Sequence, residues 1–246
     1  MPKLTGAELP QKILAFSQGG STLFRAPNTL EQLLGKQEVW NEEYVTRLCA
    51  FFKAKIDDEQ TVIAIVGGGK LARRQIEKAK RAGLSNQFAL DNLGIAVTIQ
   101  NACKLRGSLF QKGISVQYYS PSLELQSGKI YVGYGDKPLH TTDYVAVVAA
   151  HEAGQNIMLN VSVAGVVHPM KDDKPDETVS LQELTWDNYI STIAHHHEAG
   201  LSSPLDLPAA EYARGHGMTV VFVGPDIENI ERCLRGEEFI GTIVHP

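Results

Sequence analysis

Three consecutive glycines, Gly67, Gly68 and Gly69, lie between a run of apolar residues and a segment with helical spacing. Glycines allow a phosphate to approach the backbone closely, and the free N–H groups at the start of a helix attract an anion. Arg73 and Arg74 follow one turn later, where a guanidinium could hold a phosphate through two hydrogen bonds. A plain tight turn followed by a solvated basic helix would contain the same residues, and the spacing is not that of a Walker A loop. The pattern therefore predicts an anion site but does not identify the ligand.

A second glycine-containing segment, 133–143, ends in the sequence Thr-Thr-Asp just before an apolar stretch with helical spacing. Hydroxyl groups at the start of a helix can cap its free N–H groups, and they can also donate hydrogen bonds to an anion. Thr141 and Thr142 are consistent with both roles. We expect them to contact a ligand.

Three adjacent histidines, His195 to His197, precede Glu198. Neighbouring residues on a helix point about 100° apart, so one face cannot direct all three side chains at one metal ion. A polar helix end or a contact between subunits is the favoured interpretation. The alternative is a metal or anion site that combines one of these histidines with others in the chain: His195 or His197 with His140, His168 or Glu198. We assign no metal ligand from the sequence.

The elements that must position these residues alternate along the chain. Residues 12–16 and 61–66 are short apolar runs that stop at polar or glycine residues, as strands buried on both faces of a parallel sheet do. Further strands are expected at 114–119, 129–132, 156–161, 218–223 and 238–244, and helices at 70–83, 90–105, 142–153, 181–193, 207–215 and 226–235. This order predicts an α/β fold, a three-layer αβα sandwich around a mainly parallel sheet. Ligands of such sheets bind beyond the carboxyl ends of the strands.

The 246 residues are expected to form a single domain, 1–246, because one hydrophobic core can serve up to ~250–300 residues. The net charge of −5 favours a small-molecule partner over nucleic acid or a membrane. No apolar run approaches the ~20 residues of a spanning helix, so a cytoplasmic location is expected. The polar segment 168–180 is expected to be a surface loop that could act as a lid. Cys49, Cys103 and Cys233 are expected to be reduced thiols in the core.

The order of these motifs resembles that of archaeal-type uridylate kinases, in the amino-acid-kinase fold family. Residues 67–74 followed by 91–102 resemble the signature of that family in order, spacing and residue type. Segments 133–143, 203–210, 223–232, 236–237 and 241–243 extend the resemblance over about 60–246, whereas 11–60 match poorly. The resemblance implies the amino-acid-kinase or carbamate-kinase-like fold, with an acceptor-binding half at about 1–150 and a donor-nucleotide half at about 151–246.

The resemblance also implies an activity and a site. The activity would be phosphoryl transfer from ATP, accompanied by Mg²⁺, to UMP or a similar small phosphate, in a homo-oligomer that is commonly a hexamer. The implied acceptor residues are Gly19, Gly20, Gly67, Gly68, Gly69, Arg73, Asp91, Thr98, Asn101, Thr141, Thr142 and Asp143. The implied donor-nucleotide residues are Ser162, Gly165, Lys171 and Lys174, and Asp206 would be the carboxylate that orients the catalytic lysines.

Two departures from the family pattern concern phosphoryl transfer. Ser17 occupies the place of a family lysine, and a neutral hydroxyl cannot stabilise the charge that develops on the transferring group. Residues 161–167 lack the threonine, aspartate and tyrosine of the family's donor segment. The sequence therefore leaves three interpretations: a UMP kinase with reduced activity, a non-catalytic nucleotide- or oxyanion-binding protein for sensing, storage or assembly, and a kinase of another small phosphate such as isopentenyl phosphate.

Overall fold

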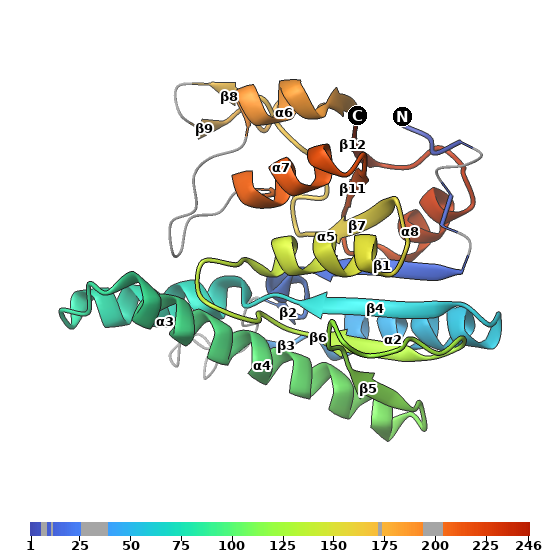
Figure 1. Cartoon of the computed structure of the whole chain (residues 1–246), viewed down its shortest axis with the longest axis horizontal. Coiled ribbons are helices and arrows are strands. Elements are labelled where there is room, and N and C mark those ends of the chain that lie inside the picture. Colours follow the sequence, from blue (N-terminus) through green and yellow to red (C-terminus); the bar gives the residue numbers. More distant parts are fainter. Residues whose placement is uncertain (6–8, 11, 26–38, 172–173, 194–203) are drawn as a thin grey trace.

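A single eight-stranded sheet runs through the molecule, with helices on both of its faces (Figure 1). The structure is a computed structural model that describes residues 1–5, 9–10, 12–25, 39–171, 174–193 and 204–246. The strand order is β10-β12-β11-β7-β1-β4-β6-β5, and every pair is parallel except β11 with β12. The predicted αβα sandwich around a mainly parallel sheet is confirmed.

The central strands are buried almost throughout, as their continuous apolar sequences predict. In chain order the strands of the sheet are β1 (Ile13–Gln18), β4 (Thr61–Val66), β5 (Val116–Tyr118), β6 (Ile130–Gly133), β7 (Ile157–Val161), β10 (Glu183–Thr185), β11 (Thr219–Val223) and β12 (Gly241–His245). Two short pairs lie outside the sheet: β2 (Phe24–Arg25) with β3 (Val39–Trp40), and β8 (Met170–Lys171) with β9 (Lys174–Pro175).

The helices divide between the two faces of the sheet. They are α2 (Glu42–Asp57), α3 (Gly69–Arg81), α4 (Gln87–Gln111), α5 (Thr142–Glu152), α6 (Trp186–Thr192), α7 (Leu207–Gly215) and α8 (Ile227–Leu234), with a short 3₁₀ turn, η2, at Gly20–Thr22. Residues of α2, α4 and α8 share one core with Leu14 and Phe16 of β1, whereas residues of α5, α6 and α7 share the other with Ala15. Successive residues of a strand point to opposite faces, so Ser17 faces the α5 layer and Gln18 the α2 layer.

Several expectations need correction. Residues 181–193 do not form one helix: β10 pairs with β12, and α6 begins only after Thr185, whose hydroxyl caps the helix by accepting from the Asn188 N–H at 3.3 Å. Pairing with a distant strand therefore overrides the helical spacing of this segment. Cys103 is exposed on α4, and only Cys49 and Cys233 are buried thiols. Helix α2, which begins after the capping residue Asn41, was not expected from the sequence.

Other helices and strands begin or end a few residues away from their predicted bounds. Helix α4, for example, runs from Gln87 to Gln111 rather than from 90 to 105. The polar segment 168–180 includes β8 and β9, and an isolated bridge between Val167 and Leu181 closes its ends. Its role as a lid stays a prediction. No helix within the described part of the chain is long and apolar enough to cross a membrane.

Candidate functional site

Two glycine turns meet at the carboxyl ends of β1 and β4 and form the floor of the candidate site. A Cβ atom added to Gly20 would lie 2.3 Å from the Gly67 carbonyl oxygen, and one added to Gly69 would lie 2.4 Å from the Ser21 nitrogen. Gly69 also has a φ of +62°, which favours glycine. The Ser21 hydroxyl accepts from the Lys70 N–H at 2.9 Å, at the start of α3. Only glycine allows these two backbones to pack so closely.

Asn101, on α4, supports the Gly67–Gly69 turn through hydrogen bonds. Its side chain is fully buried in α4, and its Nδ2 donates to the carbonyl oxygens of Gly67 at 2.9 Å and Gly68 at 3.4 Å. The Asn101 Oδ1 atom has no hydrogen-bond partner among the residues that the structure describes. A buried acceptor without a partner costs about 1–3 kcal/mol, so the support that Asn101 gives the turn comes at some cost in stability.

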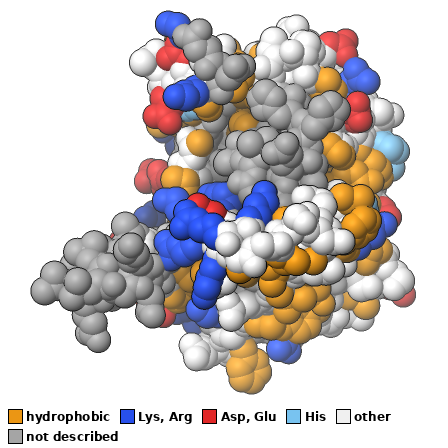
Figure 2. Space-filling model, turned by 90° about the vertical axis from the view of Figure 1, so that its left-hand side faces the viewer, with side chains coloured by type: hydrophobic (Ala, Val, Ile, Leu, Met, Phe, Trp, Pro, Cys, Tyr) orange, Lys and Arg blue, Asp and Glu red, His pale blue; other side chains and the backbone are white. Residues whose placement is uncertain are grey.

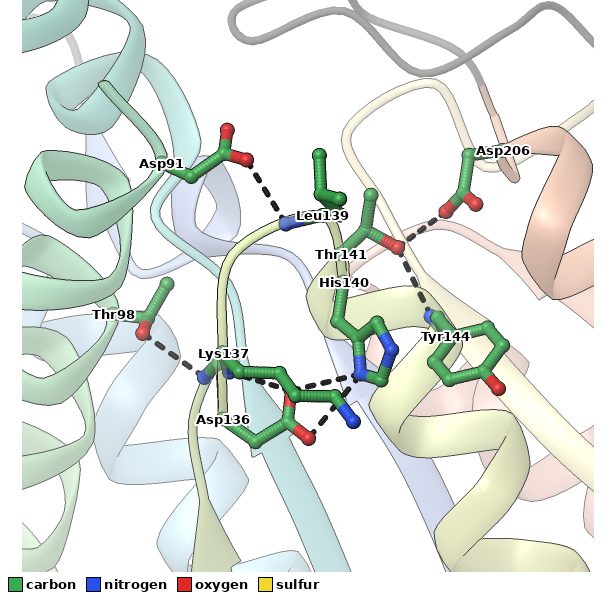
Figure 3. Close-up of polar contacts among 10 residues, drawn as sticks. Asp91, Thr98, Asp136, Lys137, Leu139, His140, Thr141, Tyr144 and Asp206 are labelled. Carbon is green, nitrogen blue, oxygen red and sulfur yellow. Dashed lines mark hydrogen bonds and ion pairs between the residues drawn. The ribbon is translucent and has the colours of Figure 1, made fainter. Parts of the chain in front are cut away.

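The loop between β6 and α5, residues 134–141, lies against α4 and is fixed at several points (Figure 3). The Gly135 N–H donates to the Thr98 hydroxyl at 3.0 Å, and the Leu139 N–H donates to Asp91 Oδ2 at 2.9 Å. Leu139 has a φ of +70°, a conformation that is strained for a residue with a branched side chain, and it is 49% exposed. Asp91 also accepts from Gln87, so its carboxylate holds a strained loop in place.

Thr141 joins this loop to α7. Its hydroxyl caps α5 by accepting from the Tyr144 N–H at 3.0 Å and donates to Asp206 Oδ2 (Figure 3). The other Asp206 oxygen caps α7 by accepting from the Ala209 N–H at 3.1 Å. Both roles expected for Thr141 from the sequence, cap and site residue, are thus compatible in one arrangement. Thr142 lies beside the glycine turn, with its hydroxyl 3.3 Å from where a Gly67 Cβ would be.

A buried carboxyl lies at the end of β1. The Ser17 hydroxyl donates to Asp143 Oδ1 at 2.5 Å, and Asn160 Nδ2 donates to the same oxygen at 3.0 Å. Burial raises the pKa of Asp143 to about 7, and the negative charge of Asp206 adds to the rise, whereas the hydrogen bonds from Ser17 and Asn160 oppose it. This carboxyl therefore keeps its proton to a much higher pH than an exposed aspartate does.

No lysine or arginine forms an ion pair with Asp143 or Asp206 within the described part of the chain. The same part of the chain contains no group of three or more His, Cys, Asp or Glu side chains that could hold a metal ion. No lysine or arginine among the described residues therefore supplies positive charge to either carboxyl. Burial is therefore the main cause of the raised pKa of Asp143, and no ion pair with a described residue opposes it.

The residues that the sequence singled out do not all come together. The structure gathers Ser17, Gly19, Gly20, the 67–69 turn, Asp91, Thr98, Asn101, the Thr-Thr-Asp motif and Asp206 at one edge of the sheet. Arg73 is half-buried on the second turn of α3. Ser162 and Gly165 follow β7, where Gly165 packs against the backbone of Gly224.

Lys171 and Lys174 are exposed on the β8–β9 pair. None of the hydrogen bonds or ion pairs between described residues joins either lysine to the site. His195, His196, His197 and Glu198 lie outside the described residues, so their role stays a prediction.

Two buried polar residues of the site were not identified from the sequence. Asn160 is the one polar residue in the buried strand β7, and besides Asp143 it bonds the Pro204 carbonyl at 3.3 Å. Gln18 Nε2 donates to the hydroxyls of Thr22 at 2.5 Å and Tyr44 at 3.2 Å, beneath the first glycine turn. A single amide inside an apolar run is the signal that could have identified Asn160.

Comparisons with known proteins support the family resemblance. A model described as the amino acid kinase family matches residues 18–224. A uridylate kinase of Methanocorpusculum labreanum is 35% identical over 188 residues, which cover 74% of this chain and 80% of that protein. A uridylate kinase of Archaeoglobus fulgidus is 28% identical over 215 residues, covering 86% and 97% of the two chains.

Two solved structures share the fold. The crystal structure of uridylate kinase from Archaeoglobus fulgidus has a TM-score of 0.69 at 24% identity and covers 95% of this chain and 100% of its own. The crystal structure of UMP kinase from Bacillus anthracis has a TM-score of 0.71 at 21% identity and covers 96% of both chains.

The raised pKa of Asp143 predicts a pH-dependent stability. A carboxyl whose pKa is about 7 when folded and about 3.8 when unfolded stabilises the folded state fully at low pH. It then loses that contribution as the pH rises from about 4 to about 7. Asp143→Asn keeps an oxygen for Ser17 and Asn160 but removes the charge. Urea unfolding at pH 8 should show the variant to be more stable by about 1–4 kcal/mol, and the difference should vanish near pH 4. Asp187→Asn, at an exposed carboxylate, is the control, and an equal response of both variants would contradict the assignment.

Proposed function

Because the chain belongs to the amino acid kinase family, we propose that it is a uridylate-kinase-like protein that binds UMP or a similar small phosphate and transfers phosphate from ATP slowly. This proposal rests on a contrast between two parts of the site: the glycine turns with the 134–141 loop, and the two carboxyls near Ser17. The glycine turns and the 134–141 loop are held by close packing and hydrogen bonds, whereas Asp143 and Asp206 pair with no lysine or arginine among the described residues.

The acceptor phosphate would lie over the glycine turns, at the start of α3. Glycine backbone and a helix N-terminus both favour an anion there. Arg73 is one turn into the same helix and makes no ion pair with any described residue, so its guanidinium is available to a phosphate. The Thr142 hydroxyl adds a possible donor at the same edge of the sheet.

The nucleoside would lie against α4 and the 134–141 loop. Asp91 can accept hydrogen bonds from the two sugar hydroxyls, but its oxygens now accept from Gln87 and from the Leu139 N–H. Binding would therefore exchange the Leu139 contact for a sugar contact. The positive φ of Leu139 makes this exchange cheaper, because release of the loop removes backbone strain.

The donor nucleotide would bind at the ends of β7 and β11, near Ser162 and Gly165, with Lys171 and Lys174 reaching its phosphates. Mg²⁺ would arrive with ATP as part of the substrate, since Mg²⁺ is usually held by one or two carboxylates together with substrate phosphates. Asp143 and Asp206 are hard oxygen donors and would suit such an ion. When bound, it would neutralise charge on the phosphates.

Catalysis should be weak in this arrangement. The main device for phosphoryl transfer is positive charge at the developing phosphoryl group. Ser17 supplies a neutral hydroxyl that is already engaged with Asp143. A non-catalytic nucleotide- or oxyanion-binding protein of the same fold is the second candidate, and the missing cation is the observation that favours it.

We also propose that the protein forms a homo-oligomer through α4. Phe88, Ile99 and Phe110 are exposed by 56%, 37% and 75%, and each is eleven residues from the next, so they share one face of the helix. Asn92, Ala96, Cys103 and Gly107 lie between them and carry no charge. An antiparallel pair of α4 helices with Ile99 on a twofold axis would place Phe88 of one copy against Phe110 of the other.

A phosphate role for Arg73 predicts a loss of affinity. Calorimetric titration of UMP at ~0.15 M salt should show that Arg73→Ala weakens binding by more than tenfold, since a charged hydrogen-bonded contact contributes roughly 1.5–3 kcal/mol. Lys78→Ala, farther along the same helix, should change affinity less than twofold at this salt. An unchanged dissociation constant in Arg73→Ala would sink the assignment.

The neutral Ser17 hydroxyl in place of a cation predicts slow turnover. A coupled assay with ATP, Mg²⁺ and UMP measures it. Ser17→Lys should raise it only a little, because the donor segment lacks its polar residues. Ala164 is exposed and occupies the place of the family aspartate, so Ser17→Lys with Ala164→Asp should exceed the product of the two separate effects. Full recovery by Ser17→Lys alone, or a native rate near ~10 s⁻¹, would show that the donor site is intact.

The α4 pairing predicts a specific pattern of disulfides in a Cys103→Ser background. Ile99→Cys should cross-link two copies by itself because the residue lies on the axis. Phe88→Cys and Phe110→Cys should cross-link only when the two variants are mixed, as shown on a non-reducing gel. Sedimentation as a monomer, or cross-linking of Phe88→Cys alone, would contradict the arrangement.

A further inference from the structure

The charges of the molecule are distributed very unevenly. Helix α3 carries six basic residues and one acidic residue within 13 positions, a net charge of +5: Lys70, Arg73, Arg74, Lys78, Lys80 and Arg81 against Glu77. The whole chain has a net charge of −5, so the remainder carries −10. Helix α2, by contrast, has three basic and three acidic residues and no net charge. The charge of α3 is therefore a local feature and not a property of the whole surface.

The positive charge of α3 lies next to the candidate site. The helix starts at Gly69, in the glycine turn of the candidate site, and runs outward from the carboxyl ends of the strands (Figure 1). Viewed from that side, Lys and Arg side chains gather in one group, next to an area of hydrophobic side chains (Figure 2). The basic helix thus lies beside the edge of the sheet where the proposed ligand enters.

The charge is only partly compensated. Arg81 pairs with Glu77 on the helix itself. Lys70, Arg73 and Lys78 make no ion pair with any residue that the structure describes, and Lys70 and Lys78 are exposed. On the neighbouring α4, the Asp91 carboxylate accepts hydrogen bonds from Gln87 and Leu139. The unbalanced charge should project a positive potential into the solvent in front of the site.

Direct contact cannot be the role of the whole helix. With a rise of 1.5 Å per residue, Lys78 and Arg81 lie roughly 13 and 18 Å along the axis from Gly69. A phosphate bound at the glycine turn is out of reach of both side chains. Attraction at such distances still operates at low ionic strength, where the Debye length is ~30 Å, and is largely screened at physiological salt, where it is ~8 Å.

We propose that the outer part of α3 steers anionic ligands, of the nucleoside monophosphate class, into the site and so raises their rate of association. The inference rests on the proposed function, because it takes the glycine turn to be where the phosphate binds. Steering changes the association rate and leaves the dissociation rate nearly unchanged, because no contact in the bound state is involved. Arg73, in contrast, would contact the bound phosphate. Its replacement should therefore raise the dissociation rate at every salt concentration.

The experiment measures association of UMP by stopped-flow fluorescence at ~10 mM and ~150 mM ionic strength. Lys78→Glu combined with Arg81→Glu changes the charge by four units at about 15 Å from a doubly charged phosphate. Coulomb's law with screening gives about a tenfold slower association at ~10 mM and less than twofold at ~150 mM. The dissociation rate should change by less than twofold in both conditions.

The matched control is Lys12→Glu combined with Lys129→Glu, which makes the same change of charge at the opposite, amino-terminal ends of β1 and β6. Association should then slow by about threefold or less at ~10 mM. Equal effects of the two pairs, or an effect of the α3 pair that persists at ~150 mM, would overturn the inference while leaving the proposed function standing. Absence of UMP binding in the native chain would overturn both.

Discussion

The close packing of two glycine turns is the constraint on which the site depends. Gly20 lies against the Gly67–Gly69 turn with no room for a Cβ atom, and this contact ties the carboxyl end of β1 to that of β4. Asn101 supports the turn from α4, and Asp91 and Thr98 of the same helix hold the 134–141 loop. Helix α4 therefore positions both the glycine turn and the 134–141 loop of the candidate site.

The candidate site contains one region that favours negative charge and one that disfavours it. At the start of α3, basic side chains and free N–H groups favour a negatively charged ligand. At the end of β1, burial and the negative charge of Asp206 raise the pKa of Asp143, and no described lysine or arginine pairs with either carboxyl. An anion is thus favoured at the start of α3, whereas a triphosphate next to Asp143 and Asp206 would meet negative charge unless a metal ion came with it.

Most of the fold could be predicted from the sequence, because a strand buried on both faces must be continuously apolar and strands alternated with helices. The failures have a common physical origin. Residues 183–185 have helical spacing but pair with β12, and Cys103 has apolar neighbours in sequence but lies on the outer face of α4. Pairing and burial are decided by segments distant in the chain, which local patterns do not contain.

The amino-acid sequence alone predicted one anion site from the glycine turns, Arg73 and the Thr-Thr-Asp motif, and it predicted that Ser17 replaces a family lysine. The chemical consequence of that replacement depends on the three-dimensional arrangement. Ser17 and Asn160 are neighbours across β1 and β7, and Asp143 comes from α5, so three segments far apart in the chain create one buried carboxyl. A pKa depends on burial and on charges nearby in space, and neither can be obtained from the residue's neighbours in the sequence.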